Sequence, residues 1–66
     1  MKNNIKTERA IHNLTQAKLA VKVKVTKWTI SQMELNNYVP SVALAVRIAR
    51  TFGKPVEEVF LFEDDE

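Results

Sequence analysis

The 66-residue sequence has no cysteine, one glycine and two prolines. Without cysteine the chain forms neither disulfides nor thiolate metal sites. A single glycine excludes a glycine-rich phosphate-binding loop, and so few turn formers argue against a domain built from many short strands. No apolar run approaches the roughly 18 residues of a membrane span, and no signal-peptide core follows the start. We therefore expect one small, soluble, cytoplasmic domain with no membrane partner.

Residues suited to catalysis are also scarce. His12 is the only histidine, and a lone histidine makes neither a metal site nor half of a catalytic triad. Glu57 and Glu58 are adjacent, so in a helix they point to different sides rather than toward one substrate. We predict no enzyme activity, no metal and no cofactor.

Charge is distributed unevenly along the chain. Residues 1–54 hold all ten lysines and arginines against two carboxylates, Glu8 and Glu34, a net charge of +8. Residues 55–66 hold six carboxylates and no cation, a net charge of −6, and residues 63–66 form an acidic tail. This layout indicates a polyanionic partner such as nucleic acid. A solvated surface with a solubilising tail is the alternative.

Five short helices are predicted from apolar spacing and helix-end signals. They cover about residues 2–12, 16–23, 27–35, 42–52 and 56–60. The expected N-caps are Thr15, Thr26 and Ser41, and Gly53 is the glycine expected after a helix. Asn13 and either Asn36 or Asn37 tolerate the left-handed conformation at helix ends. Residues 61–62 are interpreted as a last strand, a frayed end or an interface.

The stretch AVKVKVTKW, residues 20–28, alternates like a β-strand. We interpret it instead as the end of one helix, a turn at Val25 and the start of the next helix. In this interpretation Val23 belongs to the core and Val21 points away from it. An edge strand over residues 21–25 is the alternative.

The segment QAKLAVKVKVTKWTISQMEL, residues 16–35, resembles the helix-turn-helix unit of Xre-type, lambda-repressor-like transcription regulators. Ala20 matches the small position where the two helices approach closely. Further matches are LTQ, YVPS, LAVRIA and VEEVF, so the likeness extends from about Ile5 to Phe60. It implies an all-α, compact five-helix DNA-binding domain over residues 1–62, with the helix-turn-helix at about 15–35. The recognition helix, at about 26–35, is then expected in the DNA major groove.

Several positions depart from the family pattern, and three of them matter most for stability and turn geometry. Lys24 replaces the common turn glycine, and a left-handed lysine costs on the order of 1 kcal/mol. Lys18 replaces the glutamate that would complete a capping box with Thr15. Glu8 replaces an apolar residue that often seals the first helix. These departures affect stability and turn geometry more than fold class.

Candidate DNA-binding residues follow from the resemblance and from the chemistry of base and phosphate recognition. Gln16 is expected to present an amide and helix N-terminal N–H groups to phosphate, with ordinary solvent exposure as the alternative. Lys27 suits a guanine edge or a phosphate, and Gln32 suits adenine. The complete predicted set is Gln16, Lys24, Lys27, Trp28, Thr29, Ser31, Gln32, Asn37 and Tyr38.

Two aromatic residues in this set remain open to interpretation. Trp28 suits the core, a contact with a thymine methyl or sugar edge in the groove, or a protein interface. Tyr38 suits phosphate binding or packing against Pro40. Arg47 and Arg50 lie off the apolar stripe of their helix, so we expect them to be solvated or salt-bridged.

These observations predict a sequence-specific regulator of transcription, a repressor, that binds double-stranded DNA as a homodimer at a palindromic operator in the nucleoid. The dimer surface is expected at Val59, Leu61 and Phe62, where apolar residues remain after the core is counted. A protein-interaction module or an antitoxin-type protein on the same fold, with weak or no DNA readout, is the alternative.

Overall fold

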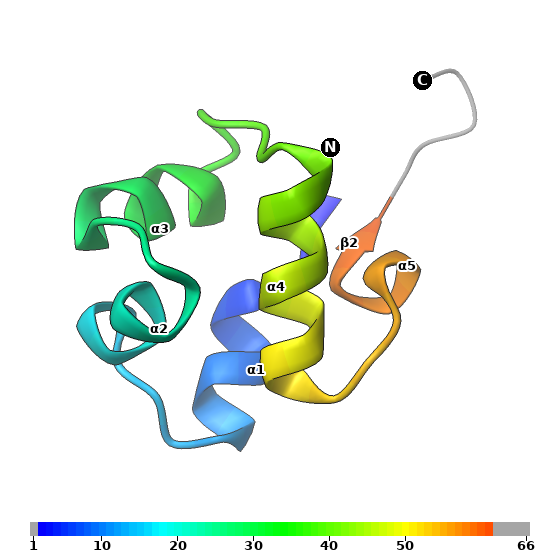
Figure 1. The fold of residues 1–66 in the computed structure, drawn as a ribbon, viewed down its shortest axis with the longest axis horizontal. Helices are drawn as coiled ribbons and strands as arrows, with labels where there is room; N and C mark the ends of the chain where they lie inside the picture. The colour runs from blue at the N-terminus through cyan, green and yellow to red at the C-terminus, as the bar shows by residue number, and fades with distance from the viewer. Residues whose placement is uncertain (1, 62–66) are drawn as a thin grey trace.

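The computed structural model describes residues 2–61 and has five helices and one small sheet within them (Figure 1). Phe62 and the acidic residues 63–66 lie outside the described residues. The elements, in chain order, are β1 (Lys2–Asn3), α1 (Ile5–Ile11), α2 (Gln16–Val23), α3 (Lys27–Glu34), α4 (Val42–Phe52), α5 (Val56–Val59) and β2 (Phe60–Leu61). The prediction of an all-α, five-helix domain is confirmed.

Helix α4 is the central element of the fold. In Figure 1, α2 and α3 lie on one side of α4, while α5 and β2 lie on the other. The apolar stripe of α4 faces the core because its members recur every three or four residues. The buried apolar residues from all elements are Ile5, Leu19, Ala20, Val23, Ile30, Met33, Leu44, Ala45, Ile48, Ala49, Phe52, Val59 and Phe60.

The helix ends follow the predicted cap residues. The side chains of Thr15, Thr26 and Ser41 each accept a hydrogen bond from the backbone N–H three residues later. Gly53 is left-handed after α4, with φ 67°. Asn13 and Asn36 are left-handed as well, with φ 55° and 63°. Local side-chain chemistry therefore sets most of the helix boundaries.

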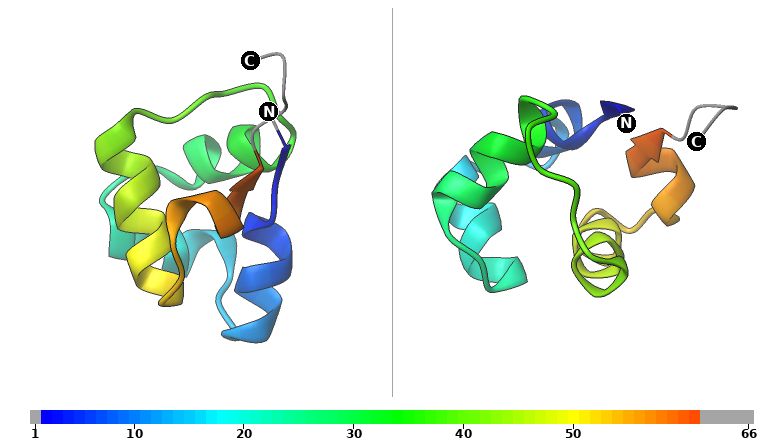
Figure 2. Two further views of the ribbon diagram at one scale, coloured as in Figure 1. Left: turned by 90° about the vertical axis from the view of Figure 1, so that its right-hand side faces the viewer. Right: turned by 90° about the horizontal axis from the view of Figure 1, so that it is seen from above.

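The predicted helical start at Lys2 is wrong, because residues 2–3 form β1. This strand pairs antiparallel with β2, with Lys2 opposite Leu61 and Asn3 opposite Phe60 (Figure 2, left). The Asn4 N–H donates to the Val59 carbonyl at 2.7 Å, which continues the pairing. The predicted C-terminal strand is present at residues 60–61, and Phe60 belongs to it rather than to α5. A two-residue strand has no local periodicity, so only its distant partner defines it.

The edge-strand alternative for residues 21–25 is wrong, because α2 continues to Val23. Val21 points outward with 79% of its surface exposed. Val25 follows the turn and packs partly buried against the core. The strand-like alternation therefore comes from Val23 and Val25 reaching one core from the two sides of a turn.

Glu8 is buried where an apolar residue was expected from the family pattern, with 4% of its surface exposed. Its Oε2 accepts a hydrogen bond from Lys54 Nζ at 2.6 Å, and its Oε1 lies 3.8 Å from His12 Nε2. The hydrogen bond with Glu8 raises the pKa of Lys54 above its ordinary value. An ion pair thus takes the place of an apolar contact between α1 and the segment after α4.

None of the helices within residues 2–61 is long and apolar enough to cross a membrane. Across the same residues, no group of three or more histidine, aspartate or glutamate side chains is placed to hold a metal ion.

Candidate nucleic-acid interface

Helices α2 and α3 form a helix-turn-helix unit around a left-handed lysine. Lys24 has φ 63° and ψ 43°, so it adopts the left-handed conformation that the turn glycine of the family usually takes. The Val25 N–H donates to the Ala20 carbonyl at 3.0 Å, and the Lys24 N–H donates to the Val21 carbonyl at 3.3 Å. This bonding is the Schellman arrangement that ends helices at a left-handed residue. The turn therefore keeps the geometry usually supplied by glycine.

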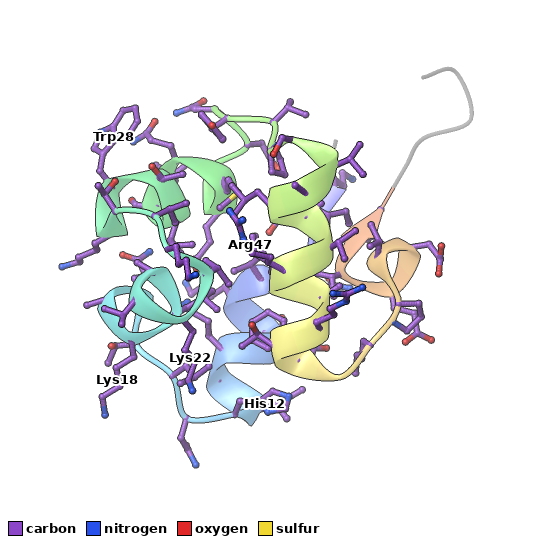
Figure 3. The ribbon with its side chains drawn as sticks, in the orientation of Figure 1. His12, Lys18, Lys22, Trp28 and Arg47 are labelled. Carbon is purple, nitrogen blue, oxygen red and sulfur yellow. The ribbon has the colours of Figure 1, made fainter. Side chains whose placement is uncertain are left out.

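The first turn of α3 is fixed by two threonines. Thr26 Oγ1 accepts from the Thr29 N–H at 3.2 Å, and the two hydroxyl oxygens lie 3.0 Å apart. Lys27 and Trp28 lie between them and are both exposed. Trp28 has 64% of its surface exposed, so the interpretation of this residue as part of the core is wrong. In Figure 3 it projects from the outer end of α3, away from α4.

A hydrogen-bonded network anchors α3 to α1 and α2. Arg9 binds Glu34 with two nitrogens, Nε to Oε2 at 2.6 Å and an Nη to Oε1 at 3.1 Å. A third Arg9 nitrogen donates to the Leu14 carbonyl at 3.0 Å. The bidentate geometry fixes the relative orientation of the two charged groups. The sequence did not predict this network. Glu34 lies on the same helical stripe as the apolar Ile30 and Met33, and a carboxylate at such a position indicates a cation facing it.

Gln16 joins the same network and is half-buried, so the interpretation of an ordinary solvent-exposed residue is wrong. Its Nε2 donates to Glu34 Oε1 at 3.2 Å. An amide NH₂ has two protons, so one remains for a phosphate at the start of α2.

The remaining polar candidates lie later in α3 and in the loop that follows it. Ser31 and Gln32 are half-buried, whereas Asn37 and Tyr38 are exposed. Asn37 Nδ2 donates to Gln32 Oε1 at 3.3 Å, and the Asn37 N–H donates to the Gln32 carbonyl at 2.9 Å. The bond to Asn37 uses one lone pair of the Gln32 amide oxygen and orients the amide group. The loop is therefore attached to the predicted reading helix.

The α2–α3 side of the molecule is positively charged. Both carboxylates of residues 1–54 are engaged, because Glu8 pairs with Lys54 and Glu34 pairs with Arg9. The exposed lysines of the unit are Lys18, Lys22, Lys24 and Lys27. Glu57 and Glu58 belong to α5, on the opposite side of α4 in Figure 1. This polarity favours approach of a polyanion to α2 and α3.

Comparison with known proteins agrees with this geometry. The chain matches the Helix-turn-helix family over residues 5–59. This range includes all five helices and leaves out the two short strands. The protein belongs to this family. It is of the Xre-type, lambda-repressor-like kind, and membership implies DNA binding and transcription regulation rather than catalysis.

Similar helix-turn-helix proteins occur in archaea and in a bacterium. An uncharacterized HTH-type transcriptional regulator of Methanocaldococcus jannaschii is 50% identical over 66 residues, the whole of both chains. One of Archaeoglobus fulgidus is 42% identical over 66 residues, 100% of this chain and 93% of the relative. The regulator YgzD of Bacillus subtilis is 40% identical over 65 residues, 98% of each chain. The likeness thus covers essentially the full domain.

Two basic features of this helix-turn-helix protein lie beside the predicted DNA-binding set. Arg47 is exposed on α4, and Figure 3 shows it on the side of α4 near α2 and α3. Lys18 and Lys22 flank a shallow depression on the outer face of α2, which Ala17 and Val21 also line. Figure 3 shows these lysines on the opposite side of the unit from Trp28. They add positive charge without lying next to the start of α3.

The predicted dimer surface needs one correction. Val59 is fully buried in the core, so it presents no surface to a partner. The error arose because Val59 was counted as left over after the core, whereas α5 turns it inward. Leu61 is 40% exposed, and Phe62 lies outside the described residues.

Proposed function

We propose that this helix-turn-helix protein is a sequence-specific repressor that binds a palindromic operator as a homodimer. It acts on the nucleoid in the cytoplasm. Helix α3 is the second helix of the unit, the one that enters the major groove in helix-turn-helix proteins, and Trp28 projects from its outer end (Figure 3). A dimer bound across a promoter represses by excluding other proteins from the same DNA.

The proposal rests on one observation above all: the first turn of α3 presents Lys27 and Trp28 to solvent while Thr26 and Thr29 bond to each other. The cap at Thr26 fixes the start of the helix backbone, and the two exposed side chains of this turn are available to meet base edges. Gln32, oriented by Asn37, is the third base-reading candidate.

Phosphate contacts are assigned to residues before and after α3. Gln16 lies at the start of α2, Lys24 in the turn, and Asn37 and Tyr38 in the loop after α3. Ser31, about a turn further along α3 than Lys27, is assigned to the groove with Gln32. Contacts to phosphate position a recognition helix without carrying sequence information themselves.

The homodimer is assigned to the surface around Leu61 on β2. This surface lies on the opposite side of α4 from α3 in Figure 1, beside the acidic residues of α5. A two-fold axis there keeps carboxylates away from DNA phosphates. In such a dimer the two α3 helices lie about 34 Å apart, one turn of DNA. A Leu61→Glu variant should be monomeric by light scattering at micromolar concentration, while a dimeric variant would contradict this surface.

The decisive experiment selects bound duplexes from a randomised DNA library. The affinity of the protein for the enriched duplex is then measured across a series of salt concentrations. We expect an enriched palindrome and a log K that falls steeply with log salt, by about 0.9 for each phosphate neutralised. Lys27→Gln should weaken binding, whereas Lys6→Gln, at an exposed position of α1, is the matched control and should not. Weak binding without an enriched sequence would instead support the protein-interaction or antitoxin-type alternative.

A further inference from the structure

Trp28 is an exposed aromatic residue with no structural task in its own domain. It is the second residue of α3, and 64% of its surface is exposed. The one aromatic pair within residues 2–61 joins His12 and Phe52, at 5.4 Å between ring centroids, so Trp28 stacks on no described aromatic ring. An exposed indole at the projecting end of α3 is therefore available for a ligand.

The indole has a combination of groups that matches one base. Its Nε1–H is a hydrogen-bond donor, and the rest of the ring is apolar. In the major groove thymine presents an O4 acceptor next to a C5 methyl group, while cytosine presents an N4 amino donor. A donor-only ring thus gains a hydrogen bond and an apolar contact at thymine, but meets a second donor at cytosine.

The surroundings of Trp28 favour DNA over an apolar protein partner as its ligand. Lys27 precedes it and Lys24 lies in the turn just before α3, and both lysines are exposed. The two carboxylates of residues 1–54 are both held in ion pairs elsewhere. Since Thr26 and Thr29 bond to each other, Trp28 and Lys27 are the groups of this turn left to touch base edges.

We propose that Trp28 reads a thymine in each half-site, with its ring against the C5 methyl group and its Nε1–H donating to O4. This inference rests on the proposed function, since it needs α3 in the major groove. It assigns a distinct specificity to the position: the operator must carry a thymine where the first turn of α3 meets the bases.

The test uses the operator selected from the randomised library, with each thymine replaced in turn by uracil, which removes only the methyl group. At the position read by Trp28, we expect binding to weaken about fourfold for one half-site and about fifteenfold for both. Replacing that thymine–adenine pair with 5-methylcytosine–guanine keeps the methyl but loses the O4 acceptor. Binding to this duplex should be weaker than to thymine, and stronger than to the unmethylated cytosine duplex.

A variant and a spectroscopic signal connect the methyl effect to this residue. Trp28→Gln should still bind DNA but should not distinguish thymine from uracil at the same position. Circular dichroism should show it folded, because the indole is not part of the core. Trp28 is the only tryptophan, so the intrinsic fluorescence of the wild-type protein should change when the operator is added.

The outcomes separate this inference from the proposed function. Specific binding with equal affinity for thymine and uracil at every position would overturn the thymine contact and leave the proposed function standing. A methyl effect that persists in Trp28→Gln would also overturn it, since another residue would then read the methyl. No enriched sequence at all would overturn both, and would assign the exposed indole to a protein interface.

Discussion

Replacing Lys24 with glycine should stabilise the domain. Lys24 is left-handed, with φ 63° and ψ 43°, and its side chain is exposed. The hydrogen bonds of the turn use backbone atoms, the N–H groups of Lys24 and Val25, so the substitution retains them. Of the three non-glycine residues with positive φ within residues 2–61, the other two are asparagines, which tolerate this conformation better. Lys24 is therefore the strained position of the set.

The expected gain is about 0.8 kcal/mol, the middle of the range that two opposing effects leave. A left-handed conformation costs a residue with a Cβ atom about 1–2 kcal/mol, and the greater freedom of glycine in the unfolded chain offsets about 0.4–1 kcal/mol of that. For a domain of this size, 1 kcal/mol corresponds to a rise in Tm of about 4–8 °C.

The measurement is thermal or urea unfolding of wild type, Lys24→Gly and Lys22→Gly. Lys22 is the matched control, because it is also an exposed lysine but lies inside α2, in a right-handed conformation. Glycine there should destabilise the domain by about 1 kcal/mol. The two variants lose the same charge, so opposite signs isolate the backbone effect. An unchanged or lower Tm for Lys24→Gly would refute the reasoning that the turn is strained.

Three further predictions concern the side chains that hold the unit. Thr26→Ala removes the cap of α3 and should cost about 1 kcal/mol in urea unfolding, with weaker operator binding. Arg9→Met leaves the nearly buried Glu34 carboxylate without its cation and should cost about 3 kcal/mol, much of it recovered by Glu34→Gln in the double variant. Glu8 raises the pKa of Lys54, so the Lys54–Glu8 ion pair stabilises the folded domain fully below the ordinary lysine pKa of about 10.4. This stabilisation is lost as pH rises through the folded-state pKa of Lys54. Thermal scans in that alkaline range should show Lys54→Arg losing less stability than wild type, because arginine stays charged.

The helices of the unit were predictable because their causes are local. The stripes of Leu19, Val23, Ile30 and Met33 recur at helical spacing, and threonines mark both helix starts. The left-handed turn at residue 24 followed from the family pattern. Each of these features depends on residues within a few positions of one another, so the sequence carries the signal directly.

Two of the misses come from distance along the chain, and two come from not knowing which side of a helix is covered. Strand β1 exists only through partners 57 and 59 positions away, and Glu34 depends on Arg9, 25 positions away. Val59 was expected at the surface because its short helix gives no indication of which side the core lies on. Helical spacing likewise showed that Trp28 points away from the apolar stripe of its helix. It did not show whether another part of the chain packs on that side.

The pairing of β1 with β2 constrains the order of events during synthesis. Residue 2 leaves the ribosome early, yet its partner Leu61 is made only after all five helices. Until then the Asn4 N–H lacks its acceptor, and the core lacks Val59 and Phe60. A nascent chain that stops before these residues already contains the whole helix-turn-helix but cannot close its core. We expect such incomplete chains to be less stable than the whole domain, because the last part of their core is missing.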